Sequence, residues 1–170
     1  NSGLARTRNA GFAFADAPFI LPLDADNLIL PQCLERCIGT IKETGAAVAF
    51  ATIQEFGDSH GTRSADHWKP GRFTGGNYID AMALIRRSAW AAVGGYQRMT
   101  VMGWEDYEIW CRFVEEGLWG VWIPEPLARY RVHRHSMLQT RTDIANNRAK
   151  LAAEMQALHP WVDAALLAGM

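Results

Sequence analysis

Hydrophobic and polar positions in the first third of the chain fall into blocks that predict helix and strand in turn. Residues 4–15 can form a helix, and the apolar run 19–23 predicts an interior strand of a sheet. Pro31 can open the next helix, because proline is tolerated in a first helical turn, and Gly45 can close it. The inward stripe of this helix is expected to be Leu34, Cys37, Ile38 and Ile41. The short, partly β-branched run 46–53 predicts a buried strand.

Glycine and proline interrupt the middle of the chain. Residues 54–77 contain six such positions: Gly57, Gly61, Pro70, Gly71, Gly75 and Gly76. They predict a long loop, and loops of this length often carry function. Apolar periodicity then predicts a strand at 78–85, a short helix at 86–93, and a longer helix at 104–116.

The last part of the chain combines strands with a helical tail. Residues 119–123 and 127–133 predict two strands on either side of two prolines. Thr142 can cap a final helix that ends at Pro160. The inward positions of this helix are expected to be Ile144, Leu151, Met155 and Leu158.

Helices and strands alternate early and then follow in mixed order, which predicts an α/β fold with a mixed sheet flanked by helices. Residues 1–140 would form the main unit, with 141–170 as a helical tail packed on it. The 170 residues are 49% hydrophobic and 21% charged, typical of a globular domain. A net charge of −1 gives no basic field for nucleic acid. No apolar run reaches the ~18 residues of a membrane span.

The predicted strand 19–23 runs into two carboxylates, Asp24 and Asp26, with one alanine between them. Successive strand residues point to opposite faces, so the two aspartates share a face or converge in the following turn. A divalent cation such as Mg²⁺ or Mn²⁺ would satisfy them through oxygen ligands. Aspartate is also a common turn residue, so a solvated turn explains this segment equally well.

A second acidic pair, Glu105 and Asp106, stands in the first turn of a predicted helix, where the helix dipole favours anions. Asp106 also falls on the apolar row of that helix, which comprises Ile109, Trp110, Phe113 and Val114. A carboxylate at the edge of a core can act as a general base if a substrate reaches it. Glu105 points elsewhere and is expected to tie down a neighbouring loop.

Two histidines, His133 and His135, follow the last predicted strand and are flanked by Arg131 and Arg134. All four can be surface residues. An imidazole could instead complete a carboxylate metal site, and either arginine could face phosphates.

Four tryptophans bear on sugar binding. Trp90 and Trp110 occupy helical core positions, whereas Trp104 and Trp68 are the two considered for an acceptor. Packing is the commoner role for each.

Five segments, in order from Asn1 to about Met137, resemble the family 2 glycosyltransferases of the GT-A fold. "NSGLARTRNAG" resembles the N-x-G…R-N-x-G segment, and "FILPLDADN" resembles the strand with its D-x-D. "NYIDAMALIRRSAWAAVGGYQ" is similar to the run that ends in a Gly-Gly-aromatic turn. "GWEDYEIWCRF" resembles the E-D helix, and "YRVHRHSM" the Y-R-x-H-x-x-S-M ending.

The resemblance implies an inverting transfer of sugar from a nucleotide-sugar donor to a hydroxyl of a glycan, lipid-linked or other acceptor, as in cell-surface polysaccharide biosynthesis. It assigns Asp26 as the principal ligand of Mn²⁺ or Mg²⁺, with Asp24 supporting the metal or the ribose. His133 would complete the metal site. Asp106 corresponds to the catalytic base.

The remaining assignments from the resemblance concern the two substrates. Arg8, Arg131 and Asp24 are placed on the donor diphosphate, and Glu105 and Trp104 on the acceptor side. We therefore expect Asp26 and His133 to meet at one pocket, and Asp106 to open into the cleft that holds both aspartates.

Two departures from the family pattern stand out. Asn27 replaces a third acid that many relatives carry. The opening β-α-β-α-β portion of the family, which binds the base and much of the ribose, does not match any part of this chain. We therefore expect a fragment that is inactive alone and prone to self-association, from a protein of the cytoplasm or the cytoplasmic face of a membrane.

The sequence leaves two other functions open. One is a non-catalytic, truncated or degenerate transferase module that serves binding or assembly. The other is a D-x-D phosphatase with Asp24 as nucleophile, which is disfavoured because Asn27 and Leu28 follow where that class has Thr or Val.

Overall fold

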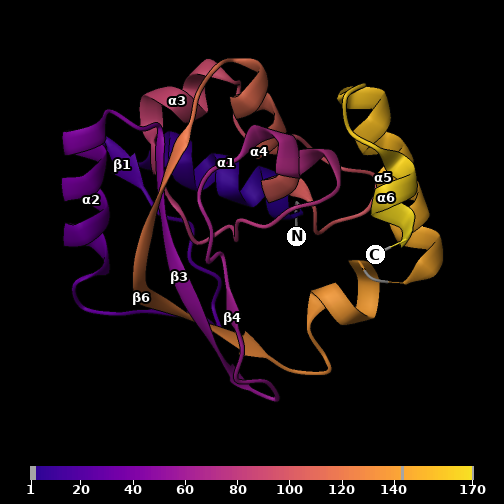
Figure 1. The fold of residues 1–170 in the computed structure, drawn as a ribbon, viewed down its shortest axis with the longest axis horizontal. Coiled ribbons are helices and arrows are strands. Elements are labelled where there is room, and N and C mark those ends of the chain that lie inside the picture. The colour runs from indigo at the N-terminus through magenta and orange to yellow at the C-terminus, as the bar shows by residue number, and fades with distance from the viewer. Residues whose placement is uncertain (1–2, 143, 170) are drawn as a thin grey trace.

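A computed structural model describes residues 3–142 and 144–169, and its centre is a mixed sheet flanked by helices (Figure 1). Within the described residues the sheet has six strands in the order β1-β5-β3-β6-β2, with β4 paired to β3. The strands are β1 (Phe19–Ile20), β2 (Leu28–Ile29), β3 (Val48–Gly57), β4 (Thr62–Arg63), β5 (Leu84–Arg86) and β6 (Gly120–Val132). The pairing of β3 with β6 is parallel and the other pairings are antiparallel, so the predicted mixed α/β sheet is confirmed.

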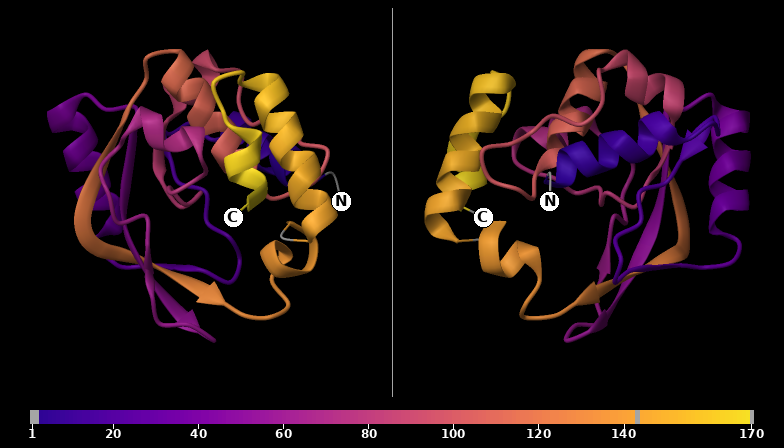
Figure 2. Two further views of the ribbon diagram at one scale, coloured as in Figure 1. Left: turned by 45° about the vertical axis from the view of Figure 1, so that its right-hand side comes forward. Right: turned by 180° about the vertical axis from the view of Figure 1, so that it is seen from behind.

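Helices cover both faces of this sheet. They are α1 (Leu4–Phe14), α2 (Cys33–Thr44), α3 (Arg87–Ala92), α4 (Glu105–Glu115), α5 (Ala145–Leu158) and α6 (Ala164–Gly169), with a 3-10 turn at Pro70–Thr74 and a π turn at Leu138–Thr142. Helix α2 lies on one face, while α1, α3 and α4 lie on the other, and α5 and α6 stand beyond α4 (Figure 2).

Strand β3 shows why the sheet has two cores. Side chains on a strand alternate between faces. Val48 and Phe50 pack with helix α4, whereas Ala49 and Ala51 pack with α2. The four residues are all at most 5% exposed, so this strand is buried on both sides, as the apolar run 46–53 predicted.

The strand predicted at 19–23 is shorter than expected, and it lies at an edge of the described sheet instead of in its interior. Only Phe19–Ile20 pairs, with β5 alone, so β1 is an edge strand of the described sheet and the predicted interior position is wrong. Pro22 has no N–H to donate to a ladder, which ends the pairing.

The strand predicted at 78–85 is largely wrong as well, because only Leu84–Arg86 pairs. Side chains satisfy the backbone before it: Ser64 accepts from the N–H of Asp80, and the Asp80 carboxylate accepts from the N–H of Met82. Local bonds of this kind compete with a ladder.

The two strands predicted around the prolines form the single strand β6. Its register against β3 shifts between Ala51 and Ile53, opposite Pro124 and Pro126. A bulge accommodates residues that lack an N–H, so the strand bends and continues. The predicted loop 54–77 is also partly wrong, because β3 extends to Gly57 and pairs there with β4.

The helices follow the prediction closely, with local exceptions. Gly45 ends α2 in the left-handed conformation, at φ 79°. Leu34 is 43% exposed, and Cys33 is buried in its place. Thr142 does not cap α5, because its hydroxyl donates to the carbonyl of Met102 and Ile144 takes the cap position. Leu151 and Met155 are fully buried as predicted, but Ile144 and Leu158 are exposed.

Candidate active site

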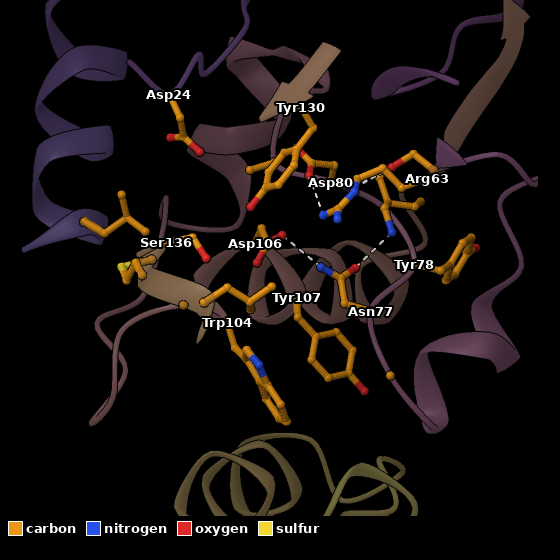
Figure 3. A pocket seen from close by; sticks show the side chains of 18 of the residues that line it. Asp24, Arg63, Asn77, Tyr78, Asp80, Trp104, Asp106, Tyr107, Tyr130 and Ser136 are labelled. Carbon is orange, nitrogen blue, oxygen red and sulfur yellow. Dashed lines mark hydrogen bonds and ion pairs between the residues drawn. The ribbon is translucent and has the colours of Figure 1, made fainter. Parts of the chain in front are cut away.

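A cavity of about 650 Å³ opens between helix α4, the turn after β1, and the end of β6 (Figure 3). Most of its polar lining comes from five separate parts of the chain: Arg8 on α1, Asp24 and Asp26 after β1, Arg63 and Ser64 at β4, Asn77 and Asp80 before β5, and Asp106 on α4. His133, His135 and Ser136 close it from beyond β6.

Asp106 lies in the first turn of α4 and faces this cavity, as expected. Its helical row is apolar and buried, since Ile109, Trp110 and Phe113 are 0% exposed. The Oδ2 atom accepts a hydrogen bond of 2.8 Å from the side-chain amide of Asn77.

The electrostatics of Asp106 are those of a proton acceptor near neutrality. Burial raises the pKa of its carboxyl to about 7, helped by the negative charge of Asp80 and opposed by the guanidinium of Arg8. A carboxylate with such a pKa can accept a proton at neutral pH and hold it.

Asp24 and Asp26 line the cavity but have different partners. Asp24 accepts from Arg8, whose Nη2 is 3.3 Å from Oδ1. Asp26 approaches His133, with 3.3 Å between Oδ2 and Nε2. A turn bond from the N–H of Asn27 to the carbonyl of Asp24 sets this divergence.

Asn27 is the residue that joins this turn to strand β6. It is 6% exposed, and its Oδ1 accepts the backbone N–H of Arg131 at 2.9 Å. Asp26 and His133 therefore meet at one pocket, as expected. The side chain of Asn27 holds the turn after β1 against the end of β6 and so keeps the two residues together. Their role as metal ligands stays a prediction.

Arg131 and Glu105 lie outside the cavity lining. The guanidinium of Arg131 stacks 4.6 Å from the ring of Phe56 and donates to the carbonyl of Asp26. The Glu105 carboxylate is 2% exposed and accepts from the N–H of Gly103 at 2.7 Å. Glu105 therefore ties down the preceding turn, as expected, and burial raises its pKa.

The two tryptophans considered for the acceptor differ. Trp104 lines the cavity and packs edge-on against Tyr107, with 5.8 Å between ring centroids. Trp68 packs against Phe73 and Trp110 and does not line the cavity. Only Trp104 is placed to meet a ligand there.

Several polar or aromatic residues of the lining have no role assigned from the sequence, among them Arg63, Asn77, Asp80 and Tyr130. Arg63 stacks 3.9 Å from the ring of Tyr130, and its Nη1 lies 3.9 Å from Oδ2 of Asp80. Burial raises the pKa of Asp80. Two signals pointed to them: the length of the loop 54–77, which contains Arg63 and Asn77, and the family-like segments 77–97 and 130–137, which contain Asn77, Asp80 and Tyr130.

The side chains at the cavity mouth fit a divalent cation that is coordinated partly by the protein and partly by a bound substrate. No group of three or more His, Cys, Asp and Glu side chains in the described residues is arranged to hold a metal alone. Asp26 and His133 offer one carboxylate and one imidazole at the cavity mouth, with side chains 46% and 35% exposed. Such a pair suits Mn²⁺ if phosphate and water supply the other positions.

Solved structures define the class of this fold. Staphylococcus aureus TarS 1-349 in complex with UDP-GlcNAc matches with a TM-score of 0.69 at 11% identity, over 92% of this chain and 46% of that one. The mannosyltransferase PcManGT of Pyrobaculum calidifontis, in complex with GDP-Man and Mn²⁺, matches with a TM-score of 0.65 at 13% identity, over 100% of this chain and 50% of that one. The fold is that of the GT-A glycosyltransferases.

The sequence places the chain within that class. The model of glycosyl transferase family 2 matches residues 1–95, and the chain belongs to this family. It is 26% identical over 141 residues to an uncharacterized glycosyltransferase of Haemophilus influenzae, covering 78% of this chain and 51% of the relative. It is 27% identical over 137 residues to the putative glycosyltransferase EpsE of Bacillus subtilis, covering 77% and 49%. The chain thus spans about half the length of the curated relatives it matches.

Proposed function

We propose that this chain carries the metal and acceptor sides of the active site of an inverting glycosyltransferase that uses a nucleotide-sugar donor. The observation that carries this proposal is the placement of Asp106. The partly buried carboxylate of Asp106, whose pKa is raised to about 7, opens into the cavity that also holds Asp24, Asp26 and His133. TarS and PcManGT, which share the fold, are seen with UDP-GlcNAc and with GDP-Man and Mn²⁺.

In the proposed reaction Asp106 accepts the proton of an acceptor hydroxyl as the hydroxyl oxygen attacks the anomeric carbon. The bond to the diphosphate breaks on the opposite side, so a single displacement inverts the anomeric configuration. Proton transfer to a positioned base contributes about 10²–10⁴ in rate. Trp104 lines the wall beside Asp106 and is proposed to contact the acceptor.

The donor side is proposed to lie at the opposite wall. Asp26 and His133 would hold Mn²⁺ or Mg²⁺, which supplies neutralisation of the departing diphosphate. The side chain of Arg8 is 11% exposed and lines the cavity beside Asp24, so it can meet a phosphate oxygen. Arg131, stacked on Phe56, would contribute only to the shape of the Asp26 turn.

The setting of the reaction is also proposed. The resemblance favours cell-surface polysaccharide synthesis at the cytoplasmic side, with a glycan, lipid-linked or other hydroxyl acceptor. In the part of the chain that the structure describes, no helix is long and apolar enough to cross a bilayer. The exposed side chains Phe14 and Leu23 are the feature on which self-association is proposed.

The test is a screen of the complete protein for hydrolysis and transfer from nucleotide-sugar donors with Mn²⁺ or Mg²⁺. Metal-dependent turnover that Asp106→Asn abolishes is expected. Turnover without a divalent cation would contradict the proposed metal dependence. No turnover with any donor would favour the non-catalytic module.

A further inference from the structure

The segment that precedes β5 is fastened to the helix that bears Asp106. Three side-chain bonds make this attachment: Tyr107 to the carbonyl of Phe73, Asn77 to the carboxylate of Asp106, and Trp110 to the carbonyl of Ile79. The first and third are buried and involve large aromatic side chains. Residues 73–79 are therefore held in a fixed position against α4, and Asn77 sits between the two anchors.

The orientation of the Asn77 amide is determined by its own backbone. Its Oδ1 accepts the N–H of Ile79 at 3.1 Å, a bond of the kind that asparagine makes in Asx turns. A backbone N–H can only donate, so Oδ1 has to face it. The Nδ2 group is then left to donate to Oδ2 of Asp106, at 2.8 Å, as Figure 3 shows.

On the basis of the glycosyl transfer proposed above, we propose that Asn77 is the positioning residue of the general base. By donating to Oδ2 it fixes the rotation of the Asp106 carboxylate and leaves Oδ1 for the acceptor hydroxyl. The same bond stabilises the ionised form of the carboxylate, because a donor prefers the charged acceptor. Asn77 acts through Asp106 and does not itself take the proton.

The neighbours of Asp106 shift its proton affinity in opposite directions. Charged and titratable groups face this carboxylate from four parts of the chain: Arg8 on α1, Asp80 in the segment before β5, Tyr96 in the turn after α3, and Glu105 on α4. Asp80 favours the protonated form of Asp106, and Arg8 favours the ionised form. Asn77 and Asp80 stand three residues apart in the chain and push the proton affinity of the base in opposite directions.

The test compares Asn77→Asp with Asp80→Asn in the complete protein, by the pH dependence of kcat. Asn77→Asp keeps an oxygen for the N–H of Ile79 but replaces the donor to Asp106 by a negative charge. We expect kcat to fall by about tenfold to a hundredfold at pH 7, with an unchanged donor KM. The acid limb of the profile should move up by about one pH unit, and with Asp80→Asn it should move down.

A melting curve of each variant separates a folding defect from a positioning defect. If Asn77→Asp unfolds, Asn77→Ser gives the second measurement, since its hydroxyl can still accept from the backbone. An inactive Asp106→Asn together with a parental kcat and acid limb in the Asn77 variants overturns the role of Asn77 alone. A fully active Asp106→Asn overturns the proposed base and the role of Asn77 with it.

Discussion

The carboxylate of Asp26 lies 3.3 Å from the imidazole of His133, which follows it by 107 residues. Neither residue would reach the other without the pairing of β2 with β6, in which Leu28 opposes Arg129. That short antiparallel contact, reinforced by the bond from Arg131 to Asn27, brings the turn after β1 to the end of β6. The pairing of β2 with β6 therefore forms the mouth of the cavity.

This relationship predicts a shared effect of Asp26 and His133 on metal activation. Asp26→Asn and His133→Ala should each raise the Mn²⁺ concentration for half-maximal activity by more than about tenfold, because each removes a proposed ligand. His135→Ala is the matched control, since His135 lines the same cavity without touching Asp26. A parental Mn²⁺ requirement in His133→Ala would remove that histidine from the site.

Asp106→Asn should reduce transfer by about 10²–10⁴ while donor and metal affinity stay near parental, because the base contributes to the chemical step alone. Single-turnover kinetics measure the rate of the chemical step, and donor titrations measure the affinity separately. Glu105→Gln is the adjacent control: its carboxylate holds Gly103 and should affect order in that turn more than chemistry. Equal losses in the two variants would argue against a specific base.

The raised pKa of Asp106 also predicts a stability gain on removing the charge. In the folded state the carboxyl holds its proton up to about pH 7, against about 3.9 in an unfolded chain. Stability from this group is therefore greatest at low pH and is lost as the pH rises toward 7. At pH 8, Asp106→Asn should be more stable than the parent by about 1–2 kcal/mol, or several degrees in Tm. Melting curves at pH 5 should show a smaller difference.

His159 predicts a second pH dependence of stability. It is 2% exposed, its Nδ1 lies 2.8 Å from Oε1 of Glu115, and its Nε2 lies 3.8 Å from Glu108. Burial alone would lower the pKa of His159, but the two nearby carboxylates raise it above 6.5. The stabilisation is thus complete below about pH 6.5 and is lost as the pH rises through the raised pKa.

The corresponding experiment is the melting temperature of His159→Gln against pH. The variant should lose about 1–3 kcal/mol at pH 6 and much less at pH 9. His135→Gln, a change at an exposed histidine, should match the parent throughout. A loss in His159→Gln that does not change with pH would show that its packing, not its charge, holds the C-terminal helices to α4.

Gly103 predicts the effect of a single added methyl group. Its φ is +127°, and a Cβ there would lie 2.2 Å from Oγ1 of Thr142. Gly103→Ala should cost about 1–3 kcal/mol and displace the π turn that borders the cavity. Gly117→Ala is the control, because φ is also positive, at +66°, but nothing lies within 4 Å of the added group. Equal melting temperatures for the two variants would contradict the contact with Thr142.

Local pattern determined the helices and the place of Asp106. The apolar row of α4 could be read from spacings of three and four, because each residue of a helix bonds within its own segment. The end of α2 at Gly45 could also be predicted from local sequence, because glycine readily adopts the left-handed conformation that ends a helix. The family resemblance added the association of Asp26 with His133, which no local pattern contains.

Tertiary structure alone decided the strand bounds and the neighbours of Asp106. A strand forms only where another segment offers its backbone groups for pairing. The apolar run 78–85 is mostly unpaired, because the side chains of Ser64 and Asp80 accept the backbone N–H groups of Asp80 and Met82. Asn77 reaches Asp106 across 29 residues because Tyr107 and Trp110 dock its loop on α4. Such a contact depends on the packing of two separate segments, and the order of residues within either segment does not specify it.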